Sequence, residues 1–429
     1  MNPKKITSEI LKENYFYMKH PSGLDIYVYP KKGYNSKYAI IGSNFGSINN
    51  KFKLNGESSY TNVPNGTAHY LEHKLFESKK GDAFELFAKT GASANAYTSF
   101  EKTAYLFSCA DNFEKSLEIL LDFVQSPYFT EQGVLKEHGI ISQEIKMYND
   151  SPDWKVLINL LGALYKNHPI NIDIAGSVES ISKITPETLY QCYNAFYNLN
   201  NMCLCVVGNV DYINVFEIVD KNLKFSPAVK VERFFPDEPY EIAKKEISKK
   251  LDVETSVFNL GFKENISKGQ RVTIKDLVYN DLIINAISSK SSTMYDELIK
   301  TQSINEISFS NEYLEGPGYA SVIFSGESQS PEKACEIIKK HIKKAHQNGI
   351  DKKTFERAKK YAYGQSLAVF NSVSSIANLQ LDFALAGKEI FEYLETLKNA
   401  DYNELNAQLD KKLDVNNSAL SIVKPKNEQ

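Results

Sequence analysis

The 429-residue chain has the composition of a globular protein with a sizeable core. Hydrophobic residues make up 42% of it and the formal net charge is -3. This charge gives no reason to expect nucleic acid or an anionic membrane as a partner. Because no run of about 18 uninterrupted apolar residues occurs, we also expect no membrane span. The length suits two domains of about 200 residues each.

The cysteines and the N-terminal residues indicate the cellular compartment in which the protein is expected. There are five cysteines, an odd number, and most of them lie in apolar patterns such as the run from Met202 to Val207. We interpret them as buried free thiols in a reducing compartment. The first residues contain no apolar stretch of signal-peptide length. Together these features predict a cytoplasmic protein.

Strand and helix patterns alternate along the first half of the chain. The predicted strands are 24–29, 38–42, two within 93–109, and 202–208. The predicted helices are one around 69–73, others near 82–89, 113–126, 131–149 and 154–165, and one after Asp211. The stretch from 225 to about 249 is rich in proline and charge, which is typical of a linker. We therefore assign 1–228 to an N-terminal domain, 229–249 to a linker and 250–429 to a C-terminal domain.

Part of the second half of the sequence resembles part of the first half. Residues 114–120 (EKSLEIL) resemble 332–338 (EKACEII), and both are followed, after a similar gap, by another predicted helix, at 130–147 and 351–368. This spacing predicts duplicated α+β domains.

The run His-Tyr-Leu-Glu-His at 69–73 is the most informative feature of the chain. On a helix, His69 and His73 project from the same face and Glu72 lies close to it. Two neutral imidazoles can bind zinc while a neighbouring carboxylate acts as the base for a metal-activated water. With only 7 histidines, chance would give this pattern in about 1 such sequence in 100. The order His-x-x-Glu-His is the inverzincin signature, so we predict a catalytic Zn2+ site here.

A catalytic zinc takes three protein ligands and keeps one position for water. The predicted helix at 131–149 carries Glu137 and Glu144, which are two turns apart and share a face. From the spacing alone, either glutamate could reach the metal. The five other histidines lie outside this constellation, and we expect no catalytic role for them: His20, His138, His168, His341 and His346.

With these motifs, the chain resembles the pitrilysin/insulinase family of zinc peptidases, in the half-length branch that includes the mitochondrial processing peptidase. In that family a helix with Glu-x6-Glu follows the inverted motif. The resemblance implies that Glu144 is the third zinc ligand and that Glu137 supports the site, with Glu72 as the general base. It also implies the fold: an α+β chain with two homologous α/β-sandwich domains, each a mixed or antiparallel sheet covered by helices, forming half of a clamshell.

The stretch 91–107 resembles the substrate strand of the family, with its Asn-Ala-x-Thr motif, and the strand after it. This resemblance implies that Asn95, Ala96 and Tyr97 pair with the backbone of the substrate. Strand pairing requires an extended or unfolded peptide. The likeness is greatest to bacterial subunits found in pairs, in which one chain holds zinc and the other does not.

One departure from the family pattern matters for function. Full family members carry in the C-terminal half an Arg and, seven residues on, a Tyr that reach the substrate and the oxyanion. Here Ile299 and Glu306 occupy those places, and no Arg lies between Arg271 and Arg357. Lys300 could not replace the bidentate contacts of a guanidinium. We therefore expect half of an active site, completed in a heterodimer by a related subunit.

Two other hypotheses remain open. The chain could be a self-sufficient homodimeric peptidase that uses other groups for the oxyanion, or a non-catalytic, zinc-containing peptide-binding subunit. The intact Glu72 argues against the last hypothesis, because a structural zinc site has no use for a base beside an open position. The second copy of the repeat lacks the motif and has Arg357 and Gly364 near the places of the two glutamates. Only the first half therefore retains the metal chemistry.

Overall fold

The computed structural model describes residues 3–79, 81–224 and 227–426. Contacts divide the chain into two units, each with its own sheet and core. Unit 1 consists of Met1–Ile145, Asp173–Phe234 and Leu367–Phe391, and unit 2 consists of Lys146–Ile172, Phe235–Ser366 and Glu392–Gln429. The α+β class and the two homologous sandwiches expected from the sequence are confirmed. The boundary between Phe234 and Phe235 falls within the expected linker, but the division into 1–228, 229–249 and 250–429 stays a prediction.

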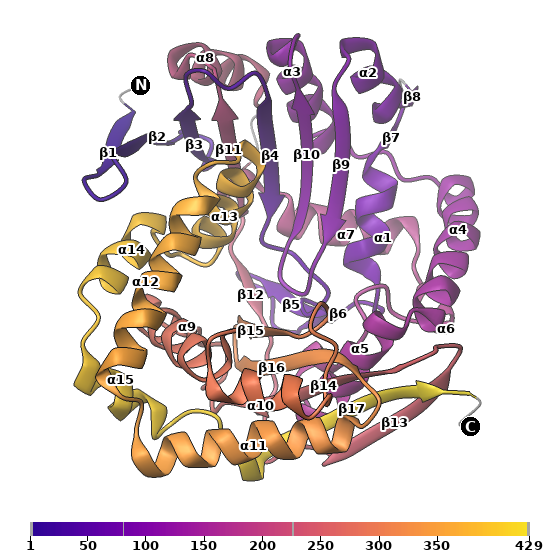
Figure 1. The fold of residues 1–429 in the computed structure, drawn as a ribbon. Helices are drawn as coiled ribbons and strands as arrows, with labels where there is room; N and C mark the ends of the chain where they lie inside the picture. The colour runs from indigo at the N-terminus through magenta and orange to yellow at the C-terminus, as the bar shows by residue number, and fades with distance from the viewer. Residues whose placement is uncertain (1–2, 80, 225–226, 427–429) are drawn as a thin grey trace. The chain divides into compact units, whose positions relative to one another are not determined.

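Unit 1 is built on a seven-stranded sheet (Figure 1). Its strands are, in spatial order, β1 (Lys4–Ser8), β2 (Glu13–Lys19), β3 (Asp25–Pro30), β11 (Met202–Gly208), β4 (Lys37–Ser43), β10 (Thr103–Cys109) and β9 (Ser93–Thr98). Neighbours are antiparallel except β3 and β11, which are parallel. Strand β9 therefore forms one edge of this sheet.

Helices and smaller sheets complete unit 1. Its helices are α1 (Thr67–Leu75), α2 (Ala83–Thr90), α3 (Phe113–Val124), most of α4 (Glu131–Asp150), α6 (Val178–Ile181), α7 (Pro186–Phe196), α8 (Tyr212–Asn222) and α13 (Val373–Leu385), with the 3-10 turn η2 (Leu199–Asn201). Strands β12 (Val231–Arg233), β5 (Lys51–Leu54) and β6 (Thr61–Asn62) form one small sheet, and β7 (Glu77–Ser78) and β8 (Gly81–Asp82) form another. The helices and strands predicted in the first half are all confirmed. The elements that were not predicted are β1, β2, β5, β6, β7, β8, β12, α6 and α7.

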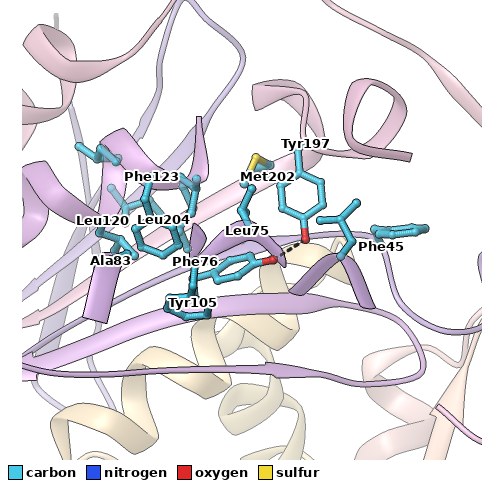
Figure 2. Close-up of a cluster of buried hydrophobic side chains, with 14 of the residues drawn as sticks. Phe45, Leu75, Phe76, Ala83, Tyr105, Leu120, Phe123, Tyr197, Met202 and Leu204 are labelled. Carbon is cyan, nitrogen blue, oxygen red and sulfur yellow. Dashed lines mark hydrogen bonds between the residues drawn. The ribbon is translucent and has the colours of Figure 1, made fainter. Parts of the chain in front are cut away.

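The core of unit 1 follows from side-chain alternation along the strands. On β4, Ala39 and Ile41 point into a large apolar cluster that also takes side chains from α1, α3, α7 and α8. Figure 2 shows part of this cluster, where the hydroxyls of Tyr105 and Tyr197 bond to each other at 2.7 Å. That bond matters because an unpaired buried hydroxyl would destabilise the core.

Unit 2 repeats the central topology of unit 1. Its sheet has the order β13 (Glu246–Leu251), β17 (Ser418–Pro425), β14 (Ser256–Lys263), β16 (Tyr319–Ser328) and β15 (Ser310–Gly316), and only β13 and β17 are parallel. In chain order and direction these strands correspond one to one with β3, β11, β4, β10 and β9. The helices of unit 2 are α5 (Pro152–Leu164), α9 (Ile274–Ser288), α10 (Thr293–Lys300), α11 (Pro331–Asn348), most of α12 (Lys352–Val369), α14 (Ile390–Lys398) and α15 (Tyr402–Leu409), with turns η1 (Pro169–Asn171) and η3 (Val415–Asn417). Helices α11 and α12 cover the predicted repeats, so the duplication is confirmed.

One pair of corresponding helices is exchanged between the repeats. Helix α5 follows α4 in the first half of the chain but packs on β14 and β17 of unit 2, whereas α13, its counterpart, lies across β11 and β4 of unit 1 (Figure 1). In one covered strand of each sheet, a glycine at the sixth position makes room for the helix. A Cβ on Gly261 of β14 would lie 2.8 Å from Leu164, and one on Gly42 of β4 would lie 2.9 Å from Leu381.

Two expectations about the whole chain can be compared with the structure. Among the residues that the structure describes, no helix is both long and apolar enough to cross a membrane. All five cysteines are free and buried, as the apolar patterns predicted.

The close approach of α5 to its strand predicts the effect of a single methyl group. Gly261→Ala should lower the free energy of unfolding by about 1–3 kcal/mol, because Leu160 and Leu164 must move in a filled core. Gly364→Ala is the matched control: it lies in α12, nothing would lie within 4 Å of its Cβ, and it should be neutral or stabilising by up to about 1 kcal/mol. Urea unfolding of both variants measures the difference. Equal stability of Gly261→Ala and the unsubstituted protein would show that the helix is not held this closely.

Candidate metal centre and general base

The helix that carries the motif begins at a position that only glycine fits. Gly66, the N-cap of α1, has a φ of 92° in the left-handed region. A Cβ there would lie 2.4 Å from the carbonyl oxygen of Ala175. The Gly66 carbonyl accepts the N–H of Tyr70, and the Thr67 hydroxyl donates to the carbonyl of Pro64 at 2.6 Å. This start sets the rotation of α1, and therefore the direction in which its histidines point.

The three expected metal ligands converge. One donor atom from each of His69, His73 and Glu144 can be chosen so that all three lie within 4.8 Å of one another, and among the described residues this is the one cluster of that kind. The Nε2 atoms of His69 and His73 lie 3.6 and 3.4 Å from the two carboxylate oxygens of Glu144. Two imidazoles and a carboxylate are a donor set that suits zinc. His69 is buried and the other two are half-buried, so a bound ion would be partly shielded from water.

Glu137 lies beside His73 rather than among these donors. Its Oε1 is 3.0 Å from Nδ1 of His73, which leaves Nε2 of that ring directed to Glu144. Burial alone would raise the pKa of Glu137, but the bond with His73 and the nearby ammonium of Lys74 hold this pKa below its ordinary value. A carboxylate on the far nitrogen fixes the tautomer and orientation of a ligating histidine. The geometry thus separates the two glutamates, which the spacing alone could not do.

Glu72 is buried on the same helix with a hydroxyl beside it. Thr98, at the end of edge strand β9, donates a hydrogen bond from Oγ1 to Oε2 of Glu72 at 2.6 Å. Burial raises the pKa of Glu72, while the Thr98 bond and the histidines oppose that shift without cancelling it. The Glu144 carboxylate raises the pKa of Glu72 further, because a nearby like charge disfavours ionisation.

The residues expected to bind substrate lie on the edge strand. Asn95, Ala96 and Tyr97 belong to β9, which pairs with β10 through Leu106, Tyr105 and Ala104. The Tyr97 hydroxyl donates to Oδ1 of Asn378 on α13 at 3.1 Å, so this side chain is fixed within unit 1. The Asn95 side chain is exposed and accepts the N–H of Ala96. A free strand edge beside α1 is open to pairing with an extended chain.

The positions of the missing Arg and Tyr fall in unit 2. Ile299, in α10, packs partly buried against the core of that unit. Glu306 follows the helix, has a side chain that is 63% exposed, and lies 3.8 Å from the ammonium of Lys290. Neither side chain offers a hydrogen-bond donor for an oxyanion.

Comparison with known proteins identifies the family of this chain. The family model described as "Insulinase (Peptidase family M16)" matches residues 56–178, and that described as "Peptidase M16 inactive domain" matches residues 183–361. The chain belongs to peptidase family M16. The uncharacterized zinc protease YmfH of Bacillus subtilis (strain 168) is 38% identical over 427 residues, which cover 99% of each chain. The resemblance stated from the motifs is therefore confirmed.

Solved structures of M16 proteins have the same fold. The crystal structure of an M16-like peptidase from Alicyclobacillus acidocaldarius superposes with a TM-score of 0.92 at 30% identity, covering 99% of each chain. Pitrilysin superposes with a TM-score of 0.75 at 15% identity, with all of this chain matched to 47% of the pitrilysin chain. This M16 chain thus has about half the length of pitrilysin.

Reasoning from the sequence missed two residues of this M16 chain that lie beside the candidate site. Thr98 is the last residue of the Asn-Ala-x-Thr motif, so a strand running beside the zinc helix would have indicated it. Lys74 follows His73 directly and is fully buried, although a lysine on a nine-residue helix normally indicates an exposed face. No local signal in the sequence distinguishes it.

Proposed function

We propose that this chain is the zinc-binding subunit of a metalloendopeptidase that hydrolyses extended peptides and works with a related M16 subunit. The observation that carries the proposal is the convergence of His69, His73 and Glu144, with the buried carboxylate of Glu72 on the same helix. The similarity to proteins named zinc proteases supports the same assignment. The five buried free thiols support a reducing compartment, such as the cytoplasm, as its location.

His69, His73 and Glu144 would hold Zn2+, and Glu137 would orient His73. When bound, zinc supplies Lewis acidity, which makes water a nucleophile near neutral pH and polarises a peptide carbonyl. No side-chain nucleophile is required for this chemistry.

Glu72 is the general base in this proposal. Thr98 holds Oε2 by its hydrogen bond, so we assign the proton transfers to Oε1. That oxygen takes a proton from the attacking water and passes it to the nitrogen of the leaving amine. The bond from Thr98 keeps the carboxylate from rotating, which preserves its distance from the reacting water.

The edge strand β9 would bind the substrate. A peptide added as a further strand beside Asn95, Ala96 and Tyr97 would gain backbone hydrogen bonds and run past Thr98 toward Glu72. Backbone pairing makes little demand on the peptide sequence, but it excludes peptide bonds inside folded structure. Unfolded or extended peptides are therefore the proposed substrates.

We infer the need for a partner subunit from two residues of unit 2 whose side chains cannot stabilise an oxyanion. Ile299 cannot donate a hydrogen bond, and Glu306 would repel a developing negative charge. A related chain with Arg and Tyr at these places would supply the missing donors.

The ligand assignment predicts the metal content of variants. The purified chain should bind one zinc ion, and His69→Ala, His73→Ala and Glu144→Gln should each lose most of it, because each removes a donor. Glu137→Gln should retain the ion with an affinity about 10- to 100-fold lower, the usual effect of altering a residue that orients a ligand. Metal analysis after dialysis against a weak chelator measures this. Full occupancy in Glu144→Gln together with an empty site in Glu137→Gln would reverse the two roles.

The role of Glu72 predicts a separation of binding from chemistry. Glu72→Gln should keep zinc and peptide affinity but lose at least about 100-fold in hydrolysis, the scale expected for a general base. Turnover of a fluorogenic peptide by the complete, partnered enzyme gives the rate, and fluorescence anisotropy gives the affinity. The exposed Glu85→Gln on α2 is the control and should behave as the unsubstituted enzyme. Unchanged turnover in Glu72→Gln would exclude this mechanism.

The half-site proposal predicts that the chain is a poor peptidase by itself. Fully loaded with zinc, it should hydrolyse peptides about 100- to 1000-fold more slowly than with its partner, because the oxyanion lacks its donors. Arg→Lys in the partner should remove the gain and leave zinc on this chain unchanged. The partner is found by purifying the native complex. Full activity of the chain alone would favour the self-sufficient homodimer instead, and absence of activity in every complex would favour a peptide-binding subunit.

A further inference from the structure

A fully buried lysine lies next to the candidate metal ligands. Lys74 follows His73 on α1 and has 0% exposure. Its Nζ is 2.5 Å from Oε2 of Glu77 and 3.8 Å from Oε2 of Glu137. The other oxygen of Glu137, Oε1, lies 3.0 Å from Nδ1 of His73. The Glu137 carboxylate thus has the imidazole of His73 beside one oxygen and the ammonium of Lys74 beside the other.

We propose that Lys74 is a positioning residue that holds the Glu137 carboxylate in place against His73. This inference rests on the proposed function, because it concerns how the site binds zinc. Lys74 touches neither substrate nor metal in this proposal, and it acts through Glu137. Its second effect is to tie α1, which carries both histidines, to α4, which carries Glu144.

Burial of the ammonium is the first argument for this role. Removing a lysine from water is costly unless paired carboxylates compensate it, so lysines usually extend their flexible stems to the surface. The Glu77 side chain is 37% exposed, and an ion pair with it alone could form at the surface. Instead the ammonium lies deeper, between Glu77 and the buried Glu137.

The first turn of α4 supplies the second argument. A Cβ on Gly133 would lie 3.1 Å from Nζ of Lys74, 3.1 Å from Oε2 of Glu77 and 3.1 Å from Oγ1 of Thr130. The absence of a side chain at 133 therefore lets α4 approach the ion pair closely. Gly139 lies six residues later on the same helix, and a Cβ on it would have nothing within 4 Å.

The positioning role and simple electrostatics predict opposite effects on zinc affinity when Lys74 is removed. An ammonium near a divalent cation repels it, so removing Lys74 would tighten zinc binding if long-range charge dominated. If Lys74 instead holds Glu137, removing it should weaken zinc binding about 10- to 100-fold, as for other residues that orient a ligand.

The main test uses Lys74→Met, which keeps the stem but removes the charge. Zinc dissociation constants are measured on the full chain by competition with a chromophoric chelator. We expect about 10- to 100-fold weaker binding for Lys74→Met and no change for Lys89→Met, an exposed lysine on α2. Because Lys74 acts through Glu137, Lys74→Met in a Glu137→Gln background should have little further effect. Equal or tighter binding by Lys74→Met, or full additivity of the two changes, would overturn the inference.

A second pair of variants covers the case in which Lys74→Met fails to fold. Gly133→Ala should weaken zinc binding several-fold by crowding the ion pair, whereas Gly139→Ala, the same change on the same helix, should not alter it. Equal zinc constants for the two alanine variants would overturn the proposal. An unsubstituted chain that binds no zinc contradicts the proposed function as well. Normal zinc binding by the unsubstituted chain with unaffected variants contradicts only the role of Lys74.

Discussion

The packing of α1 on α4 determines whether the metal centre exists, because α1 supplies His69 and His73 and α4 supplies Glu144. Donors on separate helices must be held to within a fraction of an ångström for a metal to bind well. Leu71 of α1 and Ile141 of α4 are both fully buried in the apolar core of unit 1. The Tyr70 hydroxyl adds a directed contact by donating to the carbonyl of Val134 at 2.5 Å. Substitutions in this contact should therefore affect metal affinity without touching a ligand.

The duplicated topology explains why one repeat can lose its chemistry without losing its fold. Both five-strand cores keep the same order and directions, and Gly42 and Gly261 keep the same place under the exchanged helices. These are packing requirements, and they hold in both copies. Metal donors carry no such requirement, so Arg357 and Gly364 can stand near the places where the first copy has Glu137 and Glu144. The exchange of α5 and α13 also means that neither sheet is covered by its own repeat alone, so the two repeats are expected to fold together.

The sequence predicted the local elements of unit 1 and the candidate ligands well, because both depend on short-range patterns. The spacing of His69, Glu72 and His73 places them on one helical face whatever surrounds the helix. The exchange of α5 could not be predicted in this way, since residues 154–165 have the same apolar pattern whichever sheet they cover. Lys74 illustrates the same limit: its burial depends on Gly133 and Glu137, about sixty residues away in the chain. Distinguishing Glu137 from Glu144 required either the family resemblance or the observed bond to His73.

The distribution of charge gives an independent reason to expect a cation at this site. Glu72, Glu137 and Glu144 bring three carboxylates together in a largely buried region, and burial disfavours the ionised form of Glu72 and of Glu137. Lys74 lies near both Glu77 and Glu137, and the hydrogen bonds from Thr98 and His73 lessen the cost of burying Glu72 and Glu137. With Glu77 included, these side chains comprise four carboxylates and one ammonium, and a divalent ion would reduce the excess of negative charge. A fold that only needed to be stable would replace such a cluster by apolar side chains, because a buried set of like charges destabilises the native state. The arrangement therefore suits the binding of a divalent metal, and the proposed function gives the intact Glu72 beside it a use in catalysis.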